Sequence, residues 1–121
     1  MLGRHPKVDF IELHILHHAR AGEVYGLWMI EELAGHGYKV NASQFYPKFH
    51  RLEREGLLAR NGRVIDGKLR KYYRATAAGQ RHLHGQKAKL MELAGEALTA
   101  DEIRAVLEAR LARDRQLGKR K

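Results

Sequence analysis

Apolar residues recur at helical spacing in two segments near the N-terminus. Between Val8 and Ala19 they lie three or four positions apart, with Pro6 just before them, so the pattern predicts a first helix that ends near Gly22. A second amphipathic segment covers Leu27 to Ala34, and Gly35 supplies its stop. A short loop is expected after it.

A third helix is expected to begin at Asn41 or at Ser43. Gln44 would complete an Asn-x-x-Gln capping box with Asn41, whereas Ser43 is itself a good N-cap. With either start Pro47 falls early in the helix, where its missing N–H costs least, although some bend is expected if Asn41 is the cap. The predicted buried stripe consists of Phe45, Phe49 and Leu52. The opposite face carries Gln44, Lys48, Arg51 and Glu55.

A β-hairpin is predicted after Gly56. Leu57 to Ile65 and Lys68 to Ala75 flank Asp66-Gly67, a dipeptide that tolerates the positive φ angles of a tight turn. Asn61-Gly62 is a second turn signal, which favours a bulge or break in the first strand. Strand alternation separates Tyr72 from Tyr73, and we expect Tyr73 to lie in the core.

Two further helices are expected in the C-terminal third. Thr76 is the predicted N-cap of the first, and Thr99-Ala-Asp-Glu102 forms a capping box for the second. The apolar stripe of the first is Leu83, Leu90, Met91, Ala94, Ala97 and Leu98. The stripe of the second is Ile103, Val106, Leu107, Leu111 and Leu117. The last residues, Lys119 to Lys121, are expected to form a frayed basic tail.

The charge of the chain indicates the kind of partner that it binds. Its 121 residues carry a net charge of +9 with a pI near 10.1, which favours a polyanionic partner, with nucleic acid ahead of an anionic membrane surface. The hairpin from Arg60 to Arg74 holds six lysine or arginine residues against the single acid Asp66. The absence of cysteine and of a long apolar run fits a soluble cytoplasmic protein.

The third helix and the hairpin together suit a grip on duplex DNA. Gln44, Lys48 and Arg51 share one face, so Gln44 is a candidate reader of adenine and Arg51 of guanine, while Lys48 suits a phosphate. Ser43 and Tyr46 offer hydroxyl donors near the helix start, although half-buried packing fits Tyr46 equally well. Basic residues of the hairpin would clamp the backbone or minor groove: Arg63, Lys68, Arg70 and Lys71. The simpler interpretation is a solvated polar helix face and a charged hairpin that maintain solubility.

The order of several short motifs resembles the PadR-like family of transcriptional regulators. The motifs are Tyr46-Pro47, Leu52-Glu53, Gly56-Leu57-Leu58, Gly67, Arg70-Lys71-Tyr72-Tyr73 and Thr76-Ala-Ala-Gly79. The resemblance covers about Leu13 to Leu83. Two places depart from the family pattern, Tyr25-Gly26-Leu27 and Ser43-Gln44-Phe45, which leaves base preference open.

The resemblance implies a mainly α fold with a small β-hairpin wing, that is, a winged helix-turn-helix followed by C-terminal helices. Residues 1–75 would bind DNA, and residues 76–121 would form a helical dimerisation segment with a basic tail. The recognition helix would be Ser43 to Glu55 and the wing Arg60 to Arg74. The implied function is repression by a homodimer on a pseudo-palindromic operator, with a small-molecule effector as a further candidate partner. The expected dimer contacts are Leu83, Leu90, Met91, Ala94, Ala97 and Leu98.

Two other groups of residues carry candidate chemistry. His14, His17 and His18 lie on one predicted helix at spacings that suit zinc or nickel, but no fourth ligand completes a familiar signature, so no metal is assigned. Tyr25, Trp28 and Met29 would suit a cavity for a flat apolar effector, although a core tryptophan packed against the first helix is favoured.

Three functions therefore remain in order of preference. A sequence-specific repressor comes first, a non-specific architectural DNA-binding protein second, and a metal-responsive regulator using the histidines third. No nucleophile–base pair, phosphate-binding glycine loop or paired carboxylates indicate an enzyme, and no cofactor is expected.

Overall fold

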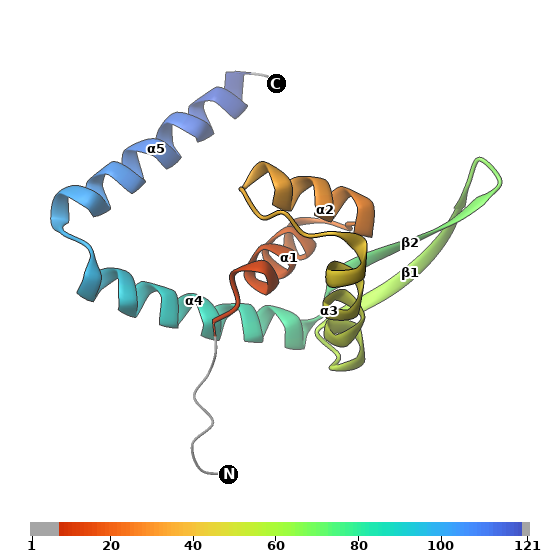
Figure 1. Cartoon of the computed structure of the whole chain (residues 1–121). Helices are drawn as coiled ribbons and strands as arrows, with labels where there is room; N and C mark the ends of the chain where they lie inside the picture. The colour runs from red at the N-terminus through yellow and green to blue at the C-terminus, as the bar shows by residue number, and fades with distance from the viewer. Residues whose placement is uncertain (1–7, 120–121) are drawn as a thin grey trace, which may run out of the picture. The chain divides into compact units, whose positions relative to one another are not determined.

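The computed structural model describes residues 8–119, so Pro6 and the last two residues of the predicted basic tail lie outside the described part (Figure 1). Five helices and one two-stranded antiparallel hairpin follow in the predicted order. Their bounds are α1 Phe10–Ala21, α2 Gly26–Gly35, α3 Ala42–Arg54, β1 Leu58–Ile65, β2 Lys68–Ala75, α4 Ala77–Ala97 and α5 Ala100–Lys119. This arrangement confirms the mainly α fold with a hairpin wing.

Side-chain caps start the first and third helices. Asp9 Oδ1 accepts from the amides of Ile11 at 2.9 Å and Glu12 at 3.2 Å, which satisfies donors that the first turn of α1 leaves unpaired. For α3 the Asn41 start is confirmed, because Asn41 Oδ1 accepts from the Gln44 amide and the Gln44 side chain accepts from the Asn41 amide.

The hairpin is regular along its whole length. The strands pair from Leu58↔Ala75 to Ile65↔Lys68 without interruption, so the break or bulge suggested by Asn61-Gly62 is absent. Asp66 at φ 52° and Gly67 at φ 76° form the turn, as the sequence predicted. A two-residue turn at Asp66-Gly67 fixes a register that leaves Asn61-Gly62 inside the strand, with Leu69 close to Gly62.

Helix α4 begins close against the end of α3. The Thr76 hydroxyl accepts from the Gly79 amide at 3.0 Å, which confirms the predicted N-cap, and donates to the Gly56 carbonyl at 2.5 Å. A Cβ on Gly79 would lie 2.1 Å from the Leu57 carbonyl oxygen. Glycine at this position therefore permits the close approach of helix and loop.

The core lies between α1, α2, α3, the base of the hairpin and the first turns of α4. The predicted stripe of α3 is fully buried, and Tyr73 is buried beside Phe49, as expected. The residues of the core are Leu13, Ile15, Leu16, Ala19, Val24, Met29, Leu33, Phe45, Phe49, Leu52, Leu58, Tyr73, Ala75 and Leu83. This core positions α3 and the hairpin relative to each other.

The chain divides into two compact units, one extending to Lys87 and the other beginning at Ala88. In the second unit Thr99 and Glu102 form the predicted capping box at the start of α5. Apolar side chains of this unit remain largely exposed. Within residues 8–119, no helix is both long enough and apolar enough to cross a membrane.

Candidate nucleic-acid interface

Two of the cations predicted to contact DNA, Lys48 and Arg51, are held by acids at the start of α1. Lys48 Nζ donates to Asp9 Oδ2 at 2.7 Å, and an Arg51 guanidinium nitrogen donates to Glu12 Oε1 at 2.9 Å. Arg51 also lies 3.7 Å from a carboxylate oxygen of Glu55. These contacts join the middle of α3 to the first turn of α1, so both cations stabilise the position of α3.

The pKa values of Asp9 and Glu12, the acids that bind Lys48 and Arg51, are shifted in opposite directions. Burial alone raises the pKa of Asp9, but the hydrogen bond from Lys48, the Glu12 amide and the charge of Lys48 outweigh it and leave the pKa below its ordinary value. For Glu12, burial dominates and raises the pKa despite the opposing charge of Arg51. Asp9 is therefore the more firmly ionised partner.

The start of α3 presents polar groups that already serve the helix cap. Ser43 Oγ donates to Asn41 Oδ1 at 2.7 Å, and Gln44 Oε1 accepts from the Asn41 amide at 3.2 Å. Both side chains are exposed. The capping bond engages the acceptor of the Gln44 amide group, so a bidentate contact with adenine would require this bond to open.

A stripe not predicted from the sequence forms the exposed face of α3. Its members, Ser43, Pro47, His50 and Arg54, follow one another at spacings of four, three and four residues, and all are exposed. Among the described residues Arg54 has no ion-pair partner within 4.0 Å, in contrast to Arg51. The signal was present in the sequence, because this stripe lies opposite the centre of the buried stripe formed by Phe45, Phe49 and Leu52.

Tyr46 adopts the half-buried position that was one of its two predicted roles. A Cβ on Gly26 would lie 2.5 Å from the Tyr46 hydroxyl, so the ring packs directly over the first residue of α2. Its ring also lies 5.3 Å from that of Phe45 and 5.9 Å from that of His50. Tyr46 thus links the core to the exposed stripe.

The outer edge of β2 pairs with the segment between α1 and α2. Val24 and Tyr73 exchange backbone hydrogen bonds of 2.8 and 2.7 Å, which fix this segment to β2. The Tyr25 and Tyr72 rings meet edge-on at 5.6 Å, and the Arg63 guanidinium lies 4.0 Å from the centre of the Tyr72 ring. Arg63 also forms an ion pair with Glu23, so this predicted DNA contact is partly engaged within the chain.

The remaining cations of the hairpin differ in how they are held. Lys68 and Lys71 are exposed, and neither has an ion-pair partner among residues 8–119. Arg70 lies 5.6 Å from the centre of the Tyr25 ring. Lys68 and Arg70 share a strand face with Tyr72, whereas Lys71 lies on the opposite face. The hairpin therefore presents positive charge on both faces.

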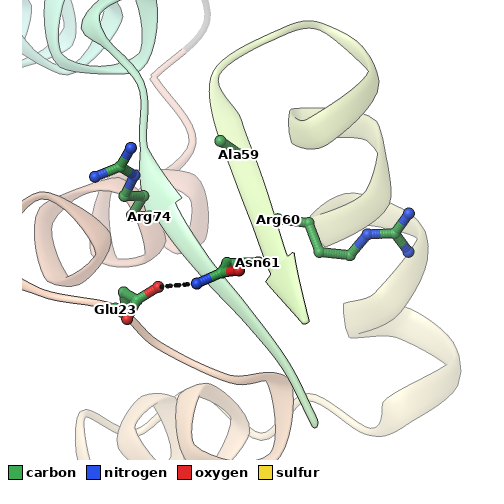
Figure 2. Close-up of a pocket in the computed structure, with 5 residues that line it drawn as sticks. All are labelled: Glu23, Ala59, Arg60, Asn61 and Arg74. Atoms are coloured by element: carbon green, nitrogen blue, oxygen red, sulfur yellow. Dashed lines mark hydrogen bonds between the residues drawn. The ribbon is translucent and has the colours of Figure 1, made fainter. Parts of the chain in front are cut away.

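A polar pocket lies at the base of the hairpin, lined by Glu23, Ala59, Arg60, Asn61 and Arg74. Figure 2 shows Asn61 directed toward Glu23, to which its amide nitrogen donates at 3.4 Å, with Arg60 and Arg74 extending to opposite sides. Arg60 lies 3.4 Å from Glu53 on α3. The lining is polar and charged, so it does not suit a flat apolar effector.

The three residues that were predicted to suit an effector cavity have separate surroundings. Trp28 packs edge-on against His18 of α1 at 5.3 Å, as the packing interpretation predicted. Met29 is fully buried in the core, and Tyr25 packs on Tyr72. The three side chains therefore contribute mainly to packing.

Histidines from α1 and the end of α2 converge. His14, His18 and His36 each offer a ring nitrogen, and these atoms lie within 4.8 Å of one another. His17, which the sequence grouped with His14 and His18, does not belong to this group, whereas His36 was not anticipated. Burial, and after it the charges of His36 and His17, lower the pKa of His14, and burial likewise lowers that of His18.

The predicted dimer contacts fall into two classes. Leu83 is 3% exposed and belongs to the core of its own chain, so it is already covered without a partner. Met91 is 69% exposed, and Leu90 and Leu98 also retain more than a third of their surface. Ala94 is half-buried and Ala97 is exposed.

Comparisons with known proteins agree with this architecture. The model of the Transcriptional regulator PadR-like family matches residues 15–85. The chain is 50% identical over 88 residues to Transcriptional regulator Rv3488 of Mycobacterium tuberculosis (strain ATCC 25618 / H37Rv), an alignment that covers 73% of this chain and 82% of that protein.

Solved structures extend the likeness to the fold. A padr family transcriptional regulator from Eggerthella lenta DSM 2243 has a TM-score of 0.62 and 35% identity, covering 75% of this chain and 82% of its own. Bacillus subtilis PadR in complex with operator DNA has a TM-score of 0.58 and 21% identity, covering 94% and 73%. The family match and the 50% identical relative together show that the chain belongs to the PadR-like family of winged-helix transcriptional regulators.

Proposed function

We propose that the chain is a homodimeric repressor that binds a pseudo-palindromic operator sequence-specifically. The observation that carries the proposal is the exposed stripe of α3, Ser43, Pro47, His50 and Arg54, on a helix anchored beside a basic hairpin. In helix-turn-helix proteins the corresponding helix enters the major groove, with its N-terminal residues at the base edges. The operator-bound structure of Bacillus subtilis PadR, which has this fold, supports the same use here.

Base reading is assigned to the start of α3 and its exposed stripe. Gln44 and Ser43 lie at the N-terminal end, where helix dipole and amides also favour a phosphate. Lys48 and Arg51 act first as positioning residues through Asp9 and Glu12. Arg51 retains 40% exposure of its side chain and further N–H donors, so it contacts DNA as a secondary reader.

The wing supplies affinity rather than base specificity. Lys68, Arg70 and Lys71 are exposed cations on a narrow hairpin, and each phosphate they neutralise releases condensed counterions. Arg63 contributes less because Glu23 already pairs with it. Residues 1–75 thus form the DNA-binding domain.

Homodimerisation is assigned to residues 76–121, and the support for it is the apolar surface of the second unit, which begins at Ala88. Leu93, Val106, Leu107 and Leu111 are each more than half exposed, in addition to Met91. Val106, Leu107 and Leu111 follow one another at helical spacing on α5, and an exposed apolar stripe of this kind is typical of interaction sites. A second copy is the occupant that fits a two-fold operator, since dimer symmetry matches operator symmetry.

A selection from genomic fragments with the purified protein at near-physiological salt tests the proposal. The best fragment is then titrated against a scrambled duplex of the same length. A palindromic motif with at least roughly 10³-fold preference supports a specific regulator. Salt-sensitive binding without a motif would instead assign the chain to the architectural class. A reporter gene placed behind the motif then distinguishes repression from activation.

A further inference from the structure

We propose that His14, His18, His36 and Glu32 form a binding site for one borderline divalent transition-metal ion, with Zn²⁺ or Ni²⁺ as the fitting chemistry. The site uses no residue of α3 or of the wing, and it does not depend on the proposed function. His14 and His18 come from α1, Glu32 from α2, and His36 directly follows α2.

The backbone brings these side chains to one place. His14 and His18 are four residues apart, so they lie on the same face of α1. Glu32 and His36 are likewise four apart, and His36 Nε2 lies 3.0 Å from Glu32 Oε2. Contacts between the two elements complete the group, since the His14 and His36 ring centres are 4.5 Å apart.

The distances fit a metal site after small side-chain rotations. Two imidazole nitrogens bound to a tetrahedral Zn²⁺ at about 2.0–2.1 Å lie roughly 3.3 Å from each other. In the structure the three ligand nitrogens all lie within 4.8 Å of one another, so each pair must approach by about 1.5 Å or less. His36 is exposed and can rotate to shorten its distances to His14 and His18, whereas the distance between His14 and His18 changes only through rotation of those two rings.

The donor set also selects the class of ion. Three imidazole nitrogens and a carboxylate oxygen match zinc and other borderline metals, whereas Mg²⁺ and Ca²⁺ require mainly oxygen ligands. Glu32 is the fourth ligand that the sequence pattern lacked. Its Oε2 atom lies 3.4 Å from His18 Nε2 as well as next to His36.

A buried polar atom at the site provides independent support. His18 Nε2 has almost no exposed surface and forms no hydrogen bond with any described residue, although Glu32 Oε2 lies 3.4 Å away. Buried nitrogen atoms nearly always have a partner. A metal ion would satisfy this atom, and it would also link α1 to the end of α2.

The test uses the full chain without an affinity tag, and Zn²⁺ as the probe. Competition with a chromophoric chelator measures stoichiometry and affinity, and thermal unfolding with and without Zn²⁺ measures stabilisation. We expect one ion per chain with a Kd below about 1 μM. A hundredfold excess over Kd should raise Tm by at least about 5 °C.

Matched variants assign the binding to this site. His14→Ala/His36→Ala should lose more than about 100-fold in affinity, since even outer partners of metal ligands are worth 10–100-fold. His82→Ala/His84→Ala removes two exposed imidazoles of α4 and should leave the affinity unchanged. If the first variant fails to fold, His36→Ala alone, an exposed substitution after α2, and Glu32→Gln give the same assignment.

Three outcomes would overturn the proposal. The first is Zn²⁺ binding weaker than about 100 μM, which would be ordinary surface association. The second is unchanged affinity in His36→Ala and Glu32→Gln. The third is an equal loss in His82→Ala/His84→Ala, which would show that the ion samples any exposed histidine.

Discussion

Asp9 binds Lys48 across the interface between α1 and α3 while capping its own helix. One carboxylate oxygen accepts from the amides of Ile11 and Glu12, and the other accepts from Lys48 Nζ at 2.7 Å. A single side chain therefore both starts α1 and fixes the orientation of α3. The contact explains why a cation on the polar face of α3 is only 26% exposed.

The first prediction concerns the charge of Asp9. Asp9→Asn retains a good N-cap but weakens the contact with Lys48, so it should lower stability at pH 7 by about 1 kcal/mol or less, as for other partly exposed pairs. The folded-state pKa of Asp9 is lowered from its ordinary value of 3.8, so its contribution is complete above that pH and disappears as pH falls through the folded-state pKa.

Urea unfolding from pH 7 down to the acid limit of folding measures this difference. Wild type and Asp9→Asn should converge at the lowest pH. Glu31→Gln, at an exposed position of α2 without an ion-pair partner among the described residues, serves as the control for loss of one carboxylate. A gap that persists unchanged in acid would assign the effect to packing rather than to charge.

The second prediction concerns the close approach at Gly79. A Cβ there would lie 2.1 Å from the Leu57 carbonyl oxygen, and this backbone atom cannot move without disturbing the base of the hairpin. Gly79→Ala should therefore destabilise the protein by about 1–3 kcal/mol. Gly85→Ala in the same helix has nothing within 4 Å and should be neutral or stabilise by up to about 1 kcal/mol.

The denaturant midpoints of Gly79→Ala and Gly85→Ala, compared with that of the wild type, measure the two changes in stability. Equal midpoints would mean that the approach of α4 to Leu57 relaxes at no cost. The comparison is informative because both substitutions add the same methyl group to the same helix.

Local features of the structure were predictable because their determinants lie close together in the sequence. The capping box of Asn41 and Gln44 and the turn at Asp66-Gly67 each require only a few neighbouring residues. The burial of Tyr73 followed from strand alternation. The same local signal was misleading at Asn61-Gly62, because the register set at Asp66-Gly67 decides which turn forms.

The candidate site was only partly predictable, since its contacts join residues far apart in the sequence. Lys48 and Arg51 meet Asp9 and Glu12 across 39 positions, and no local pattern indicates such a pair. His36 joins His14 and His18 for the same reason. The spacing of residues predicts which charged side chains share a helix face. The partner of each side chain depends on how the helices pack against one another.

The third prediction tests base reading at the start of α3. Gln44→Glu preserves an acceptor for the Asn41 amide and places an acid where the helix dipole favours it, so stability should not fall. The carboxylate cannot donate to adenine and repels phosphate, so operator affinity should decrease by about 1–3 kcal/mol, which is roughly 5- to 150-fold. Titration with the selected operator and with a scrambled duplex measures the specific and the non-specific affinity of the variant.

The matched control is Gln116→Glu, the same change at an exposed position of α5. It should leave the affinity for both duplexes nearly unchanged. Full operator affinity in Gln44→Glu would remove Gln44 from the contact surface, and an equal loss on both duplexes would reduce it to a phosphate neighbour.

The fourth prediction concerns the wing. Lys68→Gln/Lys71→Gln removes two exposed cations without ion-pair partners among the described residues, so affinity should fall on all duplexes. If both contact phosphates, the slope of log K against log salt should become shallower by about 1.8. Arg113→Gln/Arg115→Gln on α5 removes the same number of positive charges and should leave the slope almost unchanged. A matching change in this control would indicate a general charge effect.

The last prediction concerns the apolar surface of the second unit. Met91 and Leu107 are 69% and 56% exposed, and burial against a second copy would remove both from water. Met91→Glu or Leu107→Glu would place an unpaired charge in that interface, at a cost of at least about 2 kcal/mol, so the dimer dissociation constant should rise thirtyfold or more.

Light scattering coupled to size-exclusion chromatography measures the mass across a dilution series. Gln116→Glu adds a carboxylate outside the apolar stripe of α5 and should dimerise like the wild type. Because each half-site would then be bound by a separate chain, the two interface variants should also lose operator affinity while retaining the fold of the first unit. A monomeric wild type at micromolar concentration would contradict the dimer, and unchanged mass in both variants would place its contacts on another surface.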